Sequence, residues 1–420
     1  MNSVWLAGGI FLITYALIVT ERVHRTVSAL LGGTAMILLG VLSQEAAFHA
    51  IDWNVIFLLV GMMIIASVLQ ETGIFQWIAI QSVKLGQGDP FRILIILSAV
   101  IAVTSALLDN VTIVVLAAPV ALFVAASLRV SPMPFLISAI LASNIGGTAT
   151  LVGDPPNLLI GSAAGIDFVT FAANLAPISL LILIGFLGLS WFLFRNDLRA
   201  GRSDALDIEA LEAEALITNR PLLRKALVVM AGVIAGFLLH GALHLEPATI
   251  ALAGATVLLL WGRCDPHKAL QDVEWTTLVF FIGLFITVEA VVQVGIIESV
   301  AEAALRLTGG SLPLTSMLLL WLSAFASGIV DNIPYTATMI PVVENLGKSM
   351  PIMPLWWSLA LGACLGGNIT LVGAAANVVV ANLAEKSGHP ISFKRFLGYG
   401  FVTTMMSLLL ATGYVWLRYL

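Results

Sequence analysis

Long apolar runs dominate the chain and predict membrane-spanning helices. A helix needs roughly 20 apolar residues to cross the hydrocarbon core of a bilayer. Runs that approach this length are 4–20, 27–43, 53–70, 174–194, 226–243, 248–262, 276–293 and 398–417. Because such runs recur from one end of the sequence to the other, we predict an all-α polytopic membrane protein.

Two further regions, 91–160 and 312–382, are apolar but are interrupted by Asp, Asn, Gly and Pro. Irregular backbone at membrane depth is tolerated only where it is buried in protein or lines a cavity. We therefore divide each region into a re-entrant hairpin followed by a broken span. The hairpins are 91–127 and 312–345, and the broken spans are 135–162 and 354–383. This division predicts ten crossings and two hairpins.

The sequence repeats itself after about half its length. With an offset of 222 residues, Asp109-Asn110 aligns with Asp331-Asn332. With an offset of 220, Gly-Gly-Thr-Ala-Thr-Leu-Val-Gly at 146–153 aligns with Gly-Gly-Asn-Ile-Thr-Leu-Val-Gly at 366–373. A series of matches in register indicates an internal repeat, because chance similarity between apolar segments explains only isolated matches.

Each half holds five predicted crossings, an odd number, so the second half would enter the membrane from the opposite side. We predict an inverted repeat of two five-crossing halves, each with a re-entrant hairpin and a broken transmembrane helix. This architecture is typical of secondary transporters. The first membrane repeat is 1–194, the second is 226–420, and 195–225 is a cytoplasmic linker.

Charge adds the orientation and excludes several protein classes. Placing the N-terminus outside puts sixteen of the 19 Lys and Arg residues on the cytoplasmic side, which predicts that both termini are external. A net charge of −5 without a basic run argues against nucleic-acid binding. Two cysteines exclude a disulfide scaffold or a cysteine-rich metal site. Because the motifs of soluble enzymes are also missing, we predict no enzymatic activity, no cofactor and no metal.

The predicted hairpins contain the acidic residues Asp109 and Asp331, each followed by an asparagine. An aspartate at membrane depth costs roughly 2.5–3.5 kcal/mol on insertion scales and usually marks an ion or proton path. The alternative is a purely structural role, in which the side chain caps the start of a half-helix. Together with Asp154 in the first broken span, we predict that these acids couple transport to protons or ions.

The broken spans supply neutral polar groups and paired glycines, which allow an unwound backbone. We predict a substrate site near the middle of the membrane, where hairpins and broken spans meet. Its predicted residues are Asn110, Thr112, Asn144, Gly146, Gly147, Thr148, Thr150, Asn157, Asn332, Gly366, Gly367, Asn368, Thr370 and Asn377. The two halves differ, because Ala374 stands opposite Asp154 and Cys364 stands opposite Asn144. We expect Cys364 to be a packing residue.

The segment Ala-Ser-Asn-Ile-Gly-Gly-Thr-Ala-Thr-Leu-Val-Gly-Asp-Pro-Pro-Asn at 142–157, with Asp109-Asn110 upstream, resembles the ion transporter superfamily. The most similar branch is the arsenite permease group, which includes the melanosomal P protein and sodium/proton antiporter relatives. The resemblance covers nearly the whole chain. It implies a scaffold and a mobile transport domain that move in an elevator-type alternating access. Carboxylate carriers of the superfamily typically have Ser-Asn-Thr at the hairpin tips, where this chain has Asp-Asn.

The resemblance and the site chemistry together favour export of arsenite or antimonite in exchange for protons. Arsenous acid is neutral at pH 7 and presents three hydroxyls, which suit Asn, Thr and backbone groups. Sodium/proton antiport is the alternative, since it needs carboxylates and carbonyls. A carboxylate or anion carrier is less favoured, because the broken segments contain no basic residue. The expected setting is the cell inner membrane, with the lipid bilayer as partner and with association of an arsenical ATPase subunit or homodimerisation.

Overall fold

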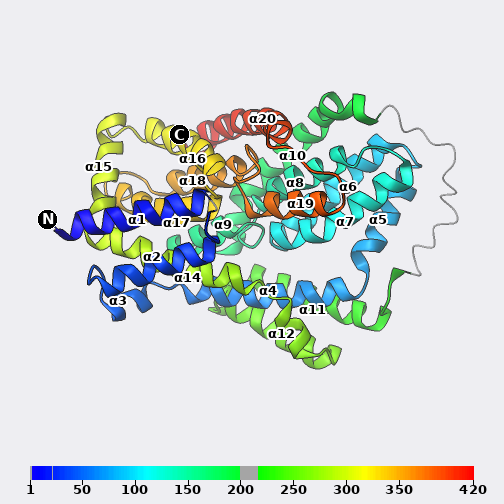
Figure 1. The fold of residues 1–420 in the computed structure, drawn as a ribbon, viewed down its shortest axis with the longest axis horizontal. Coiled ribbons are helices and arrows are strands. Elements are labelled where there is room, and N and C mark those ends of the chain that lie inside the picture. The colour runs from blue at the N-terminus through cyan, green and yellow to red at the C-terminus, as the bar shows by residue number, and fades with distance from the viewer. Residues whose placement is uncertain (1, 21, 199–215) are drawn as a thin grey trace.

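The computed structural model describes residues 2–20, 22–198 and 216–420, and the secondary structure in these ranges is helical (Figure 1). The helices of the first half are α1 Asn2–Thr20, α2 Arg25–Leu38, α3 Gln44–His49, α4 Trp53–Glu71, α5 Ile74–Leu85, α6 Pro90–Ser105, α7 Asn110–Leu128, α8 Met133–Gly147, α9 Pro155–Ala164 and α10 Phe168–Leu198. Those of the second half are α11 Arg220–Leu243, α12 Pro247–Gly262, α13 Pro266–Gln271, α14 Trp275–Gln293, α15 Ile296–Thr308, α16 Leu312–Ile329, α17 Asn332–Leu346, α18 Met353–Gly366, α19 Ala375–Lys386 and α20 Phe393–Tyr419. The all-α fold is confirmed.

Helix boundaries repeat with the same offset as the sequence. Both ends of α14 lie 222 residues after the corresponding ends of α4, and the starts of α12, α13, α15, α16 and α17 follow those of α2, α3, α5, α6 and α7 by the same number. Local signals explain the shared starts, since Asp109 and Asp331 each cap the helix that follows them. The opposite orientation of the two halves stays a prediction.

Eight helices are long and apolar enough to cross a membrane, counted over the described residues. They include seven of the helices expected to span or to form a hairpin arm at full length, such as α4 and α14. The segments 27–43 and 248–262 form the shorter helices α2 and α12, of 14 and 16 residues. The chain is therefore a multi-pass membrane protein by this criterion, whereas the count of ten crossings and the external termini stay predictions.

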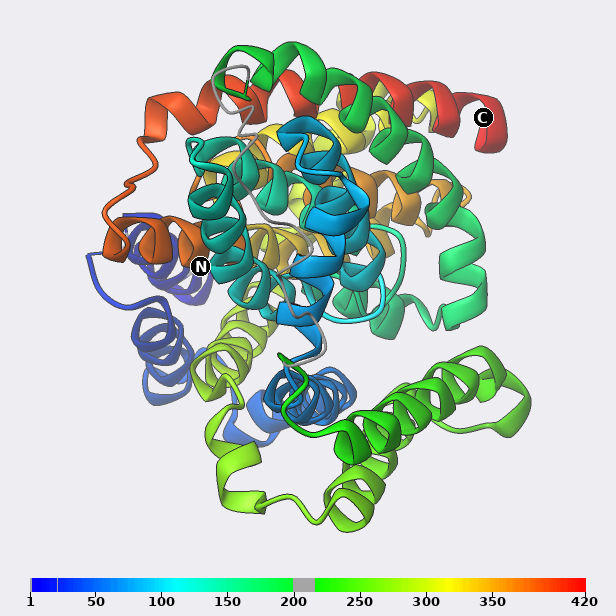
Figure 2. The ribbon, with the colours of Figure 1, turned by 90° about the vertical axis from the view of Figure 1, so that its right-hand side faces the viewer.

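The helices form two layers that we name by position. In the flanking layer, α2 packs on α14, α12 packs on α4, and α1 and α11 pack on α2 and α12. In the central bundle, α6 packs on α8 and α16 on α18, while α7 packs on α19 and α9 on α17. Figure 2 shows α11 and α12 below this bundle and α20 along its upper side. Because arms of one half pack on broken helices of the other, the two halves share one core.

The segment between the halves is shorter than the predicted linker 195–225. Helix α10 continues to Leu198, and α11 begins at Arg220, where Asn219 accepts a hydrogen bond from the Leu222 N–H at 3.0 Å. Residues 199–215 lie outside the described part of the chain. The end of the linker docks on the first half, because the Thr218 N–H donates to the Thr72 carbonyl at 3.1 Å.

Candidate functional site

Two helices of the central bundle are interrupted at the places that the glycine pairs indicate. Helix α8 ends at Gly147 and α9 starts at Pro155, while α18 ends at Gly366 and α19 starts at Ala375. A Cβ atom on Gly146 would lie 2.0 Å from the Ala102 carbonyl oxygen, and one on Gly366 would lie 2.3 Å from that of Ala324. These glycines therefore let the broken helices contact the backbones of α6 and α16.

The hairpin tips are joined to the two interruptions by main-chain hydrogen bonds. The Asn110 N–H donates to the Gly153 carbonyl at 3.0 Å, and the Asn332 N–H donates to the Gly373 carbonyl at 3.1 Å. Each hairpin therefore touches the broken helix of its own half at the same relative position. The predicted meeting of hairpins and broken spans is what the structure describes.

Side-chain amides connect the two halves at the centre of the bundle. The Asn110 Nδ2 donates to the Asn144 Oδ1 at 3.0 Å, and the Asn144 Nδ2 donates to the Oδ1 atoms of Asn368 and Asn377, both at 2.9 Å. All four side chains are at least 98% buried. We call Asn110, Asn144, Asn368 and Asn377 the amide cluster.

Two polar atoms of the amide cluster have no hydrogen-bond partner in the structure. They are the Asn110 Oδ1, an acceptor, and the Asn368 Nδ2, a donor. Leaving a buried donor or acceptor unpaired costs about 1–3 kcal/mol, so such atoms call for an explanation. A bound group that both donates and accepts hydrogen bonds, such as a hydroxyl, matches this pair of atoms.

The remaining predicted substrate residues support the interrupted backbone. The Asn157 Nδ2 donates to the carbonyls of Gly147 and Thr150, and the Asn377 Nδ2 donates equivalently to Gly367 and Thr370. The hydroxyls of three threonines donate to main-chain carbonyls, Thr148 to Asn144, Thr150 to Ala106 and Thr370 to Gly328. Structural hydrogen bonds account for these groups, and their contact with substrate stays a prediction.

The three predicted coupling acids lie close to the amide cluster but have different partners. Asp109 accepts from the Thr112 N–H at 2.8 Å and contacts the Thr112 hydroxyl. Asp154 is fully buried and lies 3.3 Å from the Asn332 Nδ2 through both of its oxygens. Asp331 accepts from the Ile333 N–H at 3.0 Å. The capping role and the coupling role are therefore compatible for both hairpin acids.

A basic residue that the sequence interpretation did not place in the site lies beside Asp331. Arg25 is the first residue of α2, and its Nη1 lies 3.0 Å from the Asp331 Oδ2. The sequence interpretation treated Arg25 only as a loop cation for orientation. The contact joins residues 306 positions apart, so only knowledge of the packing could reveal it.

Cys364 is fully buried in α18, and its thiol donates to the Asn157 Oδ1 at 3.2 Å. Cys264 is half-buried in the turn that follows α12, and both cysteines are free. The predicted absence of a disulfide is therefore seen for this pair. Cys364 packs against an amide of the first broken helix, although the alignment placed it opposite Asn144.

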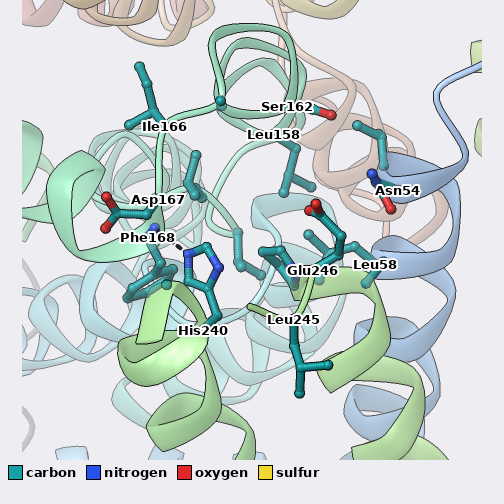
Figure 3. A pocket seen from close by; sticks show the side chains of 18 of the residues that line it. Asn54, Leu58, Leu158, Ser162, Ile166, Asp167, Phe168, His240, Leu245 and Glu246 are labelled. Carbon is teal, nitrogen blue, oxygen red and sulfur yellow. Dashed lines mark hydrogen bonds between the residues drawn. The ribbon is translucent and has the colours of Figure 1, made fainter. Parts of the chain in front are cut away.

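A cavity of about 510 Å³ lies between the flanking layer and the central bundle (Figure 3). It is lined by the start of α4, by Leu151 and Val152 of the first interruption, by the end of α9, and by the turn from α11 to α12. Its lining includes none of the predicted polar site residues. Its volume falls within the range typical of small-molecule sites.

Polar groups of this cavity hold α10 and α11 together. Figure 3 shows His240 pointing at Phe168, and its Nε2 accepts from the Phe168 N–H at 3.0 Å. The neighbouring Asp167 accepts from the N–H and hydroxyl of Thr170 at 2.8 and 2.6 Å. Burial alone would raise the pKa of Asp167, but these hydrogen bonds outweigh it and lower the pKa below its ordinary value. Asp167 therefore stays anionic at neutral pH.

Known proteins confirm the class of protein. The model of a family described as "Citrate transporter" matches residues 15–362. An uncharacterised transporter of Mycobacterium tuberculosis is 46% identical over 99% of this chain and 98% of that protein, and a 46 kDa membrane protein of Mycobacterium leprae is 45% identical over 99% of each. The human P protein is 34% identical over 97% of this chain and 59% of its own length.

A solved structure confirms the fold at lower identity. The YdaH transporter of Alcanivorax borkumensis, whose structure is described as having an unusual topology, superposes with a TM-score of 0.58 at 15% identity. The match covers 85% of this chain and 84% of that one. The relationship to the P protein is thereby confirmed, whereas membership of the arsenite permease branch stays a prediction. The chain belongs to the citrate transporter family of membrane transporters.

Proposed function

We propose that the protein is a secondary active transporter that exports arsenous acid and its antimony analogue in exchange for protons. The observation that supports this most directly is the amide cluster with its unpaired acceptor and unpaired donor. A neutral molecule with several hydroxyls can satisfy both atoms without bringing an uncompensated charge into a buried site.

The acids around the amide cluster support coupling to protons. Asp154 reaches the cluster's surroundings through Asn332, and Asp109 directly precedes Asn110. A carboxyl group that gains and loses a proton changes the charge beside the substrate site, whereas an asparagine cannot do so. Elevator-type movement of the central bundle past the flanking layer would carry both proton and substrate, and the cell inner membrane is the proposed location.

A carboxylate carrier is the second candidate, because the matching family is described by citrate. Arg25 is the basic group that the structure brings to the site and that the sequence interpretation lacked. Its guanidinium is already paired with Asp331, so a carboxylate would have to displace that partner. We therefore rank carboxylates below neutral oxyacids.

Proton flux in proteoliposomes tests this proposal. The purified protein is reconstituted with an internal pH dye, and arsenite, antimonite, sodium, succinate and citrate are added in turn. We expect arsenite and antimonite to move protons and to accumulate against their gradients when a pH gradient is imposed. Proton movement with citrate or succinate alone would replace the proposal by the carboxylate carrier, and movement with sodium alone would indicate sodium/proton antiport.

Replacing the buried thiol should leave most transport intact. Cys364→Ala removes one weak S–H hydrogen bond to Asn157, which keeps its two bonds to main-chain carbonyls. Tight arsenic capture needs two or three thiolates, and a stable As–S bond would slow release. Cys364→Ser, which keeps a donor, is the matched control for arsenite flux in the same proteoliposomes. Loss of flux in both variants at normal folding would make the thiol part of the mechanism.

A further inference from the structure

An ion pair joins the flanking layer to the tip of the second hairpin. The Arg25 Nη1 lies 3.0 Å from the Asp331 Oδ2, with the side chains 26% and 13% exposed. The guanidinium also lies over the Phe280 ring, 5.6 Å from its centroid. A second contact nearby comes from Tyr15 in α1, whose hydroxyl donates to the Pro334 carbonyl at 2.8 Å. Helices α1 and α2 thus hold the start of α17.

The corresponding place in the other half is hollow. The offset of 222 residues brings Pro247 to the position of Arg25, Leu58 to that of Phe280 and Asn54 to that of Thr276. Asn54, Leu58 and Pro247 all line the cavity of about 510 Å³, and Figure 3 shows Asn54 and Leu58 at its α4 wall. The same crevice between layers is therefore closed by a salt bridge in one half and open in the other.

Asp331 has several titratable neighbours besides Arg25. Asp154, at the start of α9, contacts Asn332 and interacts electrostatically with both Asp331 and Asp109. Glu274, before α14, interacts with Arg25 and Asp109. Tyr335 in α17 is bonded to the Ser323 hydroxyl in α16, and Tyr15 in α1 is bonded as described above. Among these groups Arg25 is the single base, so it balances a cluster of four carboxyl groups.

We propose that Arg25 is a tethered counter-ion that exchanges with the transported proton at Asp331. While Asp331 is ionised, Arg25 holds the second hairpin against the flanking layer and keeps the cavity beside α4 open. A proton that binds the Asp331 carboxylate neutralises it, so Arg25 loses its partner and the bundle is free to move toward the cavity. The proton leaves when Arg25 returns.

This role rests on the proton coupling of the proposed function, but it does not depend on which substrate is carried. It gives the two conformations a differential interaction with the proton, which any ligand-driven shift between states requires. It also explains why the cation is present in one half only, since a single exchange site is enough to couple one proton to one movement.

The test measures how open the cavity is, without substrate. Ser162, an exposed residue in the cavity wall, is changed to Cys in a Cys264→Ser background, because Cys364 is fully buried. The protein is placed in lipid nanodiscs, so that both faces are accessible, and is labelled with a charged methanethiosulfonate reagent. Each rate is divided by that of the denatured protein at the same pH, which removes the reagent's own pH dependence.

In the parent protein, labelling should fall as the pH is lowered from alkaline to mildly acidic values, because protonated Asp331 releases Arg25. Arg25→Gln and Asp331→Asn should label about threefold or more slowly at alkaline pH and should lose the pH response. Arg25→Lys keeps the charge and should behave like the parent. Arg22→Gln, which removes an exposed arginine three residues earlier, is the matched control.

Parent-like rates and pH response in Arg25→Gln would overturn the proposal. If Arg25→Gln does not fold, Asp331→Asn decides alone, because asparagine is as good a helix cap as aspartate. A failure here with substrate-driven proton flux intact would reject the counter-ion and keep the proposed function. The reverse result would keep the counter-ion and reject the substrate.

Discussion

Asp109→Asn and Asp331→Asn should abolish pH-driven transport and still bind substrate. Asparagine caps a helix as well as aspartate does, so the starts of α7 and α17 are expected to persist. What is lost is the ability to take up a proton, because an amide cannot titrate near neutral pH. Proton flux should therefore fall to the level of liposomes without protein, whereas equilibrium binding of arsenite should change little.

The adjacent amides should give the opposite separation. Asn110→Ala removes the donor to Asn144, and Asn332→Ala leaves the buried Asp154 without its amide partner. Loss of one hydrogen bond of about 1 kcal/mol weakens binding about fivefold, and the exposed polar partner adds to that loss. Asn345→Ala is the matched control in the same helix, because its side chain only bonds to Pro341.

Equilibrium dialysis with arsenite and proton flux in proteoliposomes separate the two classes of residue. Equal loss of binding in all four variants would contradict the division between proton-carrying acids and substrate-binding amides. Loss in the acid variants together with a lower unfolding temperature would instead favour a purely structural cap at the hairpin tips.

Local sequence signals were sufficient to predict much of the fold and the composition of the site. The Asp-Asn pairs mark the starts of α7 and α17, and the glycine pairs mark the ends of α8 and α18, because capping and steric demands act within a few residues. The repeat offset then carried each boundary from one half to the other. These are properties of single segments, which a sequence states directly.

Pairings between distant segments were not predictable in the same way. Asn144 was expected in the site, but its three bonds to Asn110, Asn368 and Asn377 depend on how α8 packs against the other half. Arg25 was missed because it lies outside the interrupted segments, at the start of the short helix α2. A cation at the end of a span too short to cross the bilayer is the signal that could have drawn attention to it.

The large cavity was also beyond the sequence interpretation. Its walls come from α4, α9 and the turn between α11 and α12, and most lining residues are ordinary apolar residues. Nothing in their spacing distinguishes them from residues that pack in a core. The contrast between this open crevice and the closed one at Arg25 depends on the relative position of the two layers, which is a property of one conformation of the whole chain.

The glycines of the broken helices should be among the least replaceable residues of the protein. A methyl group on Gly146 would lie 2.0 Å from the Ala102 oxygen and 2.6 Å from its carbonyl carbon, and on Gly366 it would lie 2.3 Å from the Ala324 oxygen. The obstructing atoms are backbone, so no side-chain rotation can relieve the clash. Helices α6 and α16 would have to move away from α8 and α18.

Gly146→Ala and Gly366→Ala are therefore expected to destabilise the fold by about 3 kcal/mol or more, the upper range for overpacked cores. Gly188→Ala in α10 is the control, because its added methyl group has no neighbour within 4 Å. There the better helix propensity of alanine, about 1 kcal/mol, should leave stability equal or higher. Thermal unfolding of the purified proteins in detergent measures the difference. Equal unfolding temperatures for Gly146→Ala and Gly188→Ala would show that the contact between α6 and α8 is looser than the structure describes, and the hairpin would then not be fixed to the broken helix as the proposed site requires.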